Sequence, residues 1–112
     1  MARRFFSTSA AVSAIKRLLG YPIENLDPKW KSAVETYKAN GAPKKVGQPV
    51  AEVLIFYPED GSSPVHNSGY NPEDKRDILS AKMRLADGSI APGTHHIFDD
   101  GKGTLKKGEE PE

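Results

Sequence analysis

Cysteine is absent from this 112-residue chain, and acidic residues are absent before Glu24. Without cysteine the chain has no disulfide, no thiolate metal ligand and no cysteine nucleophile. Long apolar runs are missing as well. The longest, Val53 to Tyr57, is far shorter than the ~20 residues that a membrane-spanning helix needs. We therefore expect a soluble or peripheral protein.

Apolar residues are sparse for so short a chain. They make up 37% of it, while glycine and proline number 10 and 9. Both ends are poor in core-forming residues, which leaves roughly 70 to 80 residues for one compact unit. A core of that size is marginal, so we expect partners to supply part of the stability.

Charge is unevenly distributed along the chain, although its net value is +1. Residues 1–48 hold nine Lys or Arg and three acids, whereas residues 49–112 hold seven and twelve. A nucleic-acid-binding protein would normally carry a sustained basic face, which the acidic second half does not provide. The asymmetry suits a chain that contacts two differently charged surfaces.

The first 20 residues, MARRFFSTSAAVSAIKRLLG, are rich in arginine and serine and contain no acid. This composition predicts a mitochondrial import segment. Helical spacing would align four apolar side chains on one stripe: Phe5, Val12, Ile15 and Leu19. The stretch Arg4 to Ser7 resembles a matrix processing site, with the cut after Phe6. The alternative is an ordinary basic amphipathic helix that lies on a membrane surface or on a partner protein.

The pattern that follows predicts a helix over residues 28–39. Asp27-Pro28 supplies a cap and a first-turn proline, and Asn40-Gly41 is a typical end. One apolar stripe runs along this helix: Trp30, Ala33, Val34 and Tyr37. Lys31 and Glu35 are spaced for an ion pair on the solvent side. We interpret Trp30 as a packing anchor of the core.

Later segments predict shorter elements. Residues 50–57 have the composition of a buried strand, and residues 58–70 that of a polar loop. Asn71-Pro72 favours a short helix over residues 72–80, and Asp87-Gly88 a two-residue hairpin turn between residues 82–86 and 89–91. From Asp99 the chain is charged and glycine-rich, so residues 99–112 are expected to form a tail that orders only against something else.

Together these features predict an α+β fold. We expect a small single domain with an N-terminal amphipathic helix, one or two further short helices, a few strands and extended termini. Its organisation would be an import segment at residues 1–20, a compact domain at 21–98 and a charged flexible tail at 99–112.

Residue types that bind metals gather only at His95, His96, Asp99 and Asp100. Adjacent side chains on extended backbone point to opposite faces, so at most one of the two histidines could join a shared site. We expect an ordinary surface loop there. The glycines at 101 and 103 occupy positions where a calcium loop needs oxygen ligands, and Lys102 lacks the following Ser or Thr of a phosphate loop.

Two further patterns suggest chemistry only weakly. His66 lies near Ser62, Ser63 and Ser68 in the polar loop, but no nucleophile-elbow motif surrounds these serines. Phe56 and Tyr57 resemble the stacking aromatics of RNA-binding sheets, yet nearby acids would repel phosphate, and core packing is the simpler interpretation. The sequence therefore assigns no catalytic, cofactor-binding or metal-binding residue.

The function expected from these features is that of a non-catalytic accessory subunit of a mitochondrial inner-membrane energy-transducing complex. That complex would be a respiratory complex or ATP synthase, with the chain on its soluble side in the matrix or peripheral to the membrane. Other protein subunits would be its partners, and residues 1–20 could contact the membrane surface. One alternative is a mitochondrial ribosomal protein, although the low net charge disfavours it. Another is an enzyme that uses the cluster of His95, His96, Asp99 and Asp100.

Overall fold

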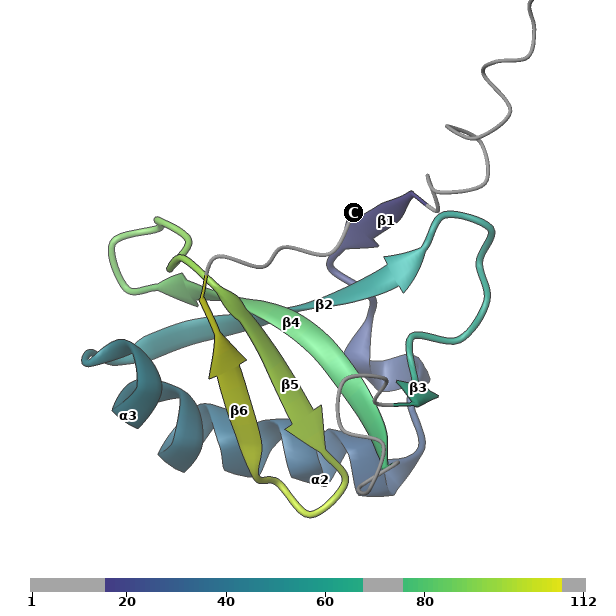
Figure 1. The fold of residues 1–112 in the computed structure, drawn as a ribbon, viewed down its shortest axis with the longest axis horizontal. Coiled ribbons are helices and arrows are strands. Elements are labelled where there is room, and N and C mark those ends of the chain that lie inside the picture. The colour runs from purple at the N-terminus through teal and green to yellow at the C-terminus, as the bar shows by residue number, and fades with distance from the viewer. Residues whose placement is uncertain (1–15, 68–75, 108–112) are drawn as a thin grey trace, which may run out of the picture.

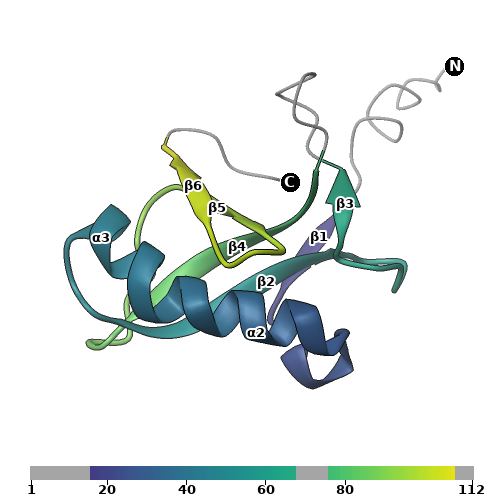
Figure 2. The ribbon, with the colours of Figure 1, turned by 90° about the horizontal axis from the view of Figure 1, so that it is seen from below.

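The computed structural model describes residues 16–67 and 76–107. A single helix of 19 residues lies across one face of a twisted antiparallel sheet (Figures 1 and 2). The strands are β1 (Arg17–Leu19), β2 (Val50–Pro58), β3 (His66–Asn67), β4 (Asp77–Leu85), β5 (Thr94–Phe98) and β6 (Gly103–Lys106). Their order is β1-β2-β4-β5-β6, and the short β3 pairs with the start of β4. None of the helices in residues 16–67 and 76–107 is long and apolar enough to cross a membrane.

The predicted fold class is wrong, because the protein is mostly β with one helix. The predicted N-terminal amphipathic helix is replaced, in its described part, by strand β1, which pairs antiparallel with the end of β2. Leu19 of the predicted stripe lies opposite Phe56 in this pair. The other three stripe residues precede residue 16, outside the described residues. Pairing with β2 overrides the helical periodicity of this segment.

The helix begins at Pro28 as predicted but continues past Gly41. It consists of α2 (Pro28–Thr36), a π-helical turn (Tyr37–Gly41) and α3 (Ala42–Val46). Pro43 lacks an amide hydrogen and would clash with a carbonyl in a regular α-helix. The wide turn just before it, in which Ala42 N–H donates to the carbonyl of Tyr37, lets the helix pass the proline. The helix ends at Val46, and the next residue, Gly47, adopts the left-handed conformation at φ 82°.

Strand β4 is the centre of the sheet, between β2 and β5. It occupies residues for which the sequence predicted a helix over 72–80. Residues 72–75 lie outside the described part, and from Asp77 the chain is extended. Pairing of Val53 with Met83 on one side and of Leu79 with Ile97 on the other fixes this conformation. The cap-and-proline signal of Asn71-Pro72 is local, and the pairing of β4 with a strand on each of its edges outweighs it.

The predicted turn at Asp87-Gly88 does reverse the chain, but through three residues rather than two. Leu85 N–H donates to the Ser89 carbonyl, Gly88 N–H donates to the Leu85 carbonyl, and Gly88 has φ 92°. This is the pattern of a three-residue hairpin loop with a left-handed glycine. Only Ile90 bridges back to β4, opposite Arg84. The next full strand, β5, begins at Thr94.

Strand β6 lies in the segment predicted to be a flexible tail. Its residues pair with β5, Thr104 opposite His96 and Leu105 opposite His95. A tight turn connects the two strands, with Phe98 N–H donating to the Lys102 carbonyl. The sequence prediction failed because β6 has few apolar side chains and is held mainly by backbone hydrogen bonds to its neighbour.

The core lies between the helix and the sheet. The predicted stripe is confirmed, since Trp30, Ala33, Val34 and Tyr37 are each at most 3% exposed. They pack against the helix-facing side chains of the sheet, chiefly Ile55, Leu79, Ala81, Met83 and Ile97. The predicted ion pair of Lys31 with Glu35 does not form. Glu35 therefore keeps its carboxylate available on the rim of the groove described next.

Candidate functional site

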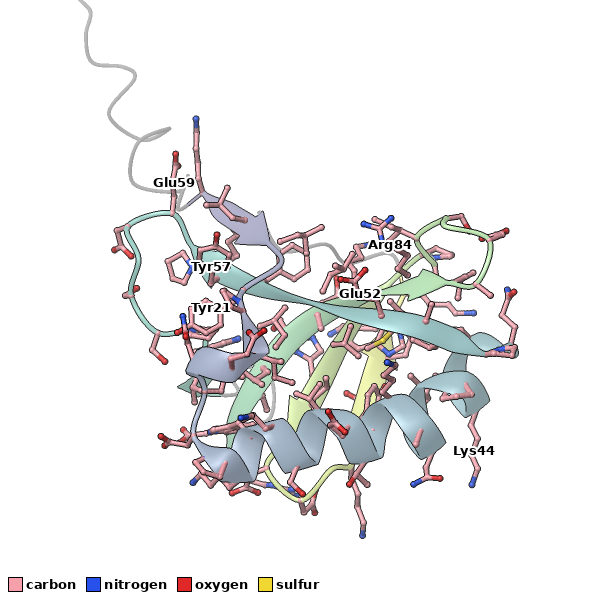
Figure 3. The ribbon with its side chains drawn as sticks, turned by 180° about the vertical axis from the view of Figure 1, so that it is seen from behind. Tyr21, Lys44, Glu52, Tyr57, Glu59 and Arg84 are labelled. Atoms are coloured by element: carbon pink, nitrogen blue, oxygen red, sulfur yellow. The ribbon has the colours of Figure 1, made fainter. Side chains whose placement is uncertain are left out.

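A groove runs between the helix and the adjoining part of β2. It consists of two adjoining hollows of about 330 and 420 Å³, which share Glu35 and Lys38 as lining residues. Figure 3 views the molecule from this side, with Tyr21 and Tyr57 toward one end and Glu52 on β2. We call this feature the α2–β2 groove. It is lined by Gly20–Glu24, Val34, Glu35, Lys38, Ala39, Pro43, Pro49, Val50, Glu52 and Val53.

The groove follows an edge of β2 that β1 leaves uncovered. β1 pairs only with Phe56, Tyr57 and Pro58, so residues 50–54 of β2 have no strand neighbour on that side within the described chain. The carbonyl of Ile55 points toward this side, because it accepts hydrogen bonds from Gly20 and Tyr21 N–H at 3.1 and 3.2 Å. Strand geometry repeats every two residues, so the N–H and C=O of Val53 point the same way.

The turn after β1 closes one end of the groove. Gly20 adopts φ 94°, and the chain then leaves β2 and descends toward the start of the helix. Tyr21 packs edge-to-face against Tyr57, with ring centroids 5.2 Å apart. Ile23 and Val34 contribute apolar surface below Val53. The groove therefore combines an apolar floor with one wall of unpaired backbone.

Charged side chains form the rim of the groove. Three are glutamates, Glu24, Glu35 and Glu52, and one is Lys38. Arg84 donates to Glu52 at 3.1 Å, an exposed ion pair that offsets this charge. Glu24 and Glu35 form no ion pair in the described chain. The rim is therefore acidic, with Lys38 as its one cation.

A buried polar pair lies deeper, between the π-helical turn and β5. The hydroxyl oxygen of Tyr37 is 2.7 Å from Nδ1 of His95, and both residues are 0% exposed. Two glycines give the tyrosine ring its space. A Cβ on Gly41 would lie 2.6 Å from Tyr37 Cδ1, and one on Gly103 would lie 2.7 Å from Tyr37 Cε1. Helix and sheet are thus joined by a hydrogen bond inside the core.

Burial dominates the protonation of this pair. It lowers the pKa of His95 from 6.5 to about 4, with smaller contributions from the charges of His96, Lys82 and Lys45. Burial also raises the pKa of Tyr37 well above its usual range. Both groups are therefore neutral at pH 7, and a hydrogen bond joins them across the 2.7 Å contact. His95 Nε2 and Thr94 Oγ1 are buried without a hydrogen-bond partner in the described part of the chain.

The four residues of metal-binding type at positions 95–100 do not form one cluster. The expectation of a surface loop at His95 and His96 is wrong, because both are in strand β5. They do point to opposite faces, as extended backbone requires: His95 enters the core, and His96 lies on the face away from the helix. Asp99 and Asp100 are in the exposed turn before β6. Within residues 16–67 and 76–107, no three His, Cys, Asp or Glu side chains are close enough to hold a metal ion.

Asp100 has a local structural role in that turn. It accepts a hydrogen bond from Lys102 N–H at 2.9 Å, and it forms an ion pair with Arg76 at 3.3 Å. The hydrogen bond from Lys102 is the main reason why the pKa of Asp100 is lowered. The guanidinium of Arg76 also lies over the ring of Phe98, 4.0 Å from its centroid. These contacts fix the β5–β6 turn.

His66 contacts a serine other than those the sequence suggested. Its Nε2 is 3.1 Å from Oγ of Ser80 on β4, and that oxygen is 3.4 Å from Nδ1 of His96. Ser80 is only 1% exposed, which argues against a nucleophilic role, since a substrate must reach the hydroxyl. The pairing arises from strand register across β3, β4 and β5, which the sequence alone does not reveal.

The remaining candidates are accounted for by local contacts. Ser62 N–H donates to Asp60, and Ser63 Oγ accepts from Val65 N–H, so both serines shape their loop. Ser68 lies outside the described residues. Phe56 is 9% exposed and therefore offers little surface for a stacked base. No family model, curated protein or solved structure matches this chain.

Proposed function

We propose that the protein is a non-catalytic accessory subunit of a mitochondrial inner-membrane energy-transducing complex, either a respiratory complex or ATP synthase, attached on the soluble side. The observation that carries the assembly role is the edge of β2 beside the α2–β2 groove, which no strand of residues 16–67 and 76–107 covers. Unpaired strand edges readily add a strand from another chain, and proteins usually cover or charge them. A subunit that docks through this edge would cover it.

The proposed compartment rests on residues 1–20, with four basic residues and no acid. The fold is compatible with processing of this segment. The processing-like site after Phe6 precedes every element that the structure describes, and the sheet begins only at Arg17. A cut there would leave β1 and its pairing with β2 intact. A cut after residue 20 would remove β1 and expose the rest of the β2 edge.

The acidic rim of the groove favours a protein partner over RNA at this surface, since Glu24 and Glu35 would repel phosphate. This supports the accessory-subunit proposal over a mitochondrial ribosomal protein, whose anchoring would rest on cationic contacts with the RNA backbone.

Fractionation of mitochondria tests the proposal. After ribonuclease treatment the protein should sediment with inner membranes, and in native electrophoresis of detergent extracts it should co-migrate with a respiratory complex or ATP synthase. A reporter fused to residues 1–20 should enter mitochondria, and replacing Arg3, Arg4, Lys16 and Arg17 with Glu should abolish its import. Recovery of the protein only in ribonuclease-sensitive particles that dissociate steeply with salt would instead identify a ribosomal subunit.

A further inference from the structure

We propose that the α2–β2 groove binds an extended, basic segment of a partner subunit, which adds to the sheet as a strand beside residues 50–54 of β2. This inference rests on the accessory role proposed above and names the chemistry of its partner. The occupant would continue the line of β1, in the place that β1 leaves when the chain turns away at Gly20.

Backbone geometry defines the first requirement on the occupant. Val53 directs its N–H and C=O toward the groove, on the same side as the carbonyl of Ile55. Neither of these two groups is hydrogen-bonded to another described residue. A neighbouring strand satisfies these groups in pairs, which is the usual mode of β-strand addition. The stretch from Val50 to Leu54 corresponds to about 13 Å of extended chain at a rise of ~3.3 Å per residue, with a register shift between Val50 and Glu52. A short extended segment fits, whereas a helix could not pair with this edge.

The floor of the groove defines the second requirement. Ile23 and Val34 lie on the side of the helix, and Val53 on the side of the sheet. Side chains of an added strand alternate between its two faces. Every second residue of the occupant would therefore place an apolar side chain over Val34. The residues between them would face away from the helix or toward the rim.

Charge defines the third requirement. Glu24 lies at the closed end of the groove, and Glu35 lies where its two hollows meet. Neither forms an ion pair in the described chain, and Lys38 is the one basic residue among those that line the groove. An occupant with Lys or Arg at alternate positions would complement this rim, whereas an acidic one would be repelled. Exposed pairs of this kind are each weak, so charge selects the partner while strand pairing and the apolar floor supply most of the affinity.

A synthetic peptide provides the test. The probe is an acetylated and amidated heptapeptide of alternating valine and lysine, compared with the same peptide carrying glutamate in place of lysine. Titration of the isotopically labelled full chain, followed by amide chemical shifts, should show binding of the lysine peptide with changes centred on residues 50–54 and on the helix near Glu35. The glutamate peptide should bind about tenfold more weakly or not at all, and salt should reduce the difference.

Two variants and one control separate the contributions. Val53→Pro removes the outward N–H, and a proline is tolerated where that N–H faces no strand, so the fold should persist while binding is lost. The double variant Glu24→Lys with Glu35→Lys should weaken the lysine peptide about tenfold and favour the glutamate peptide. Glu59→Lys changes an exposed acid just beyond the end of β2, outside the groove, and should leave the affinity unchanged (Figure 3).

The proposal is overturned if neither peptide binds, if both bind alike, or if the shifts lie away from β2. If the Val53→Pro variant misfolds, the proposal can still be refuted, because the double variant Glu24→Lys with Glu35→Lys tests the same site. Nuclear Overhauser contacts between Val53 and residues 1–15 of the same chain would identify an internal occupant instead. A concentration-dependent dimer that Val53→Pro abolishes would identify a second copy. Because peptide binding uses the isolated chain, its failure is distinct from absence of the protein from an inner-membrane complex.

Discussion

Mild acid should destabilise the protein through His95. This side chain is 0% exposed, and burial holds its pKa at about 4 instead of 6.5. Between these two values the unfolded chain binds a proton that the folded chain does not, so stability falls as the pH drops through that window. Linkage gives a loss of about 2 kcal/mol at pH 5 and about 3 kcal/mol once the histidine is protonated in both states. For a domain of this size either value is a large part of the total stability.

Urea unfolding followed by the fluorescence of Trp30, the single tryptophan, measures this effect between about pH 7.5 and 5. His95→Gln keeps an acceptor for the Tyr37 hydroxyl but does not titrate, so its stability should be nearly constant over the same range. The carboxyl groups whose pKa is lowered, Asp60, Asp87 and Asp100, lose their contribution only as the pH falls below about 3.8. Their effect therefore lies outside the window.

Tyr37→Phe is the matched control for this experiment. It removes the hydrogen bond that joins Tyr37 to His95 Nδ1 but leaves the imidazole buried. The whole stability curve should therefore fall by about 1 to 3 kcal/mol, while its pH dependence between about pH 7.5 and 5 is retained. If His95→Gln and the unmodified chain showed the same slope, burial of a neutral histidine would not be the cause, and the argument would fail.

Three further predictions concern packing. Trp30→Ala should cost about 3 to 5 kcal/mol in chemical denaturation, because Trp30 is 3% exposed in the core. Lys44→Ala, at an exposed position of α3, should change stability by less than about 0.5 kcal/mol, and a similar small loss for Trp30→Ala would contradict the packing. Gly103→Ala should cost roughly 1 to 3 kcal/mol, since its Cβ would lie 2.6 Å from the His96 carbonyl oxygen. Unchanged thermal unfolding of this last variant would show that β6 moves aside freely.

Elements whose signals are contained within one segment could be predicted from the sequence. The helix begins at the predicted Pro28, although Asp27 makes no side-chain capping hydrogen bond, and the spacing of Trp30 and Tyr37 identifies the buried side of the helix. The run of apolar and β-branched residues in 50–57 likewise specifies β2. These signals reflect local backbone preference and burial, which act over a few residues whatever the rest of the chain does.

The extent of the helix depended on tertiary packing. Asn40-Gly41 predicted its end, but Gly41 instead lies in a π-helical turn against the ring of Tyr37. That ring is also held by Gly103 and by the hydrogen bond to His95, which is 58 residues away in the sequence. A contact across such a separation has no counterpart in the local pattern.

The candidate site shows most clearly which features the sequence predicts and which the tertiary structure decides. The sequence alone determined the basic, acid-free N-terminal segment, the apolar stripe of the helix and the strand at residues 50–57. Only the tertiary structure decided that β1 stops at Leu19, so that part of β2 beside Glu24 and Glu35 has no strand neighbour among the described residues. It also decided that His95 is buried while His96 is not. Strand pairing and register are set by residues far apart in the chain, and these choose which groups are covered and which remain for a partner.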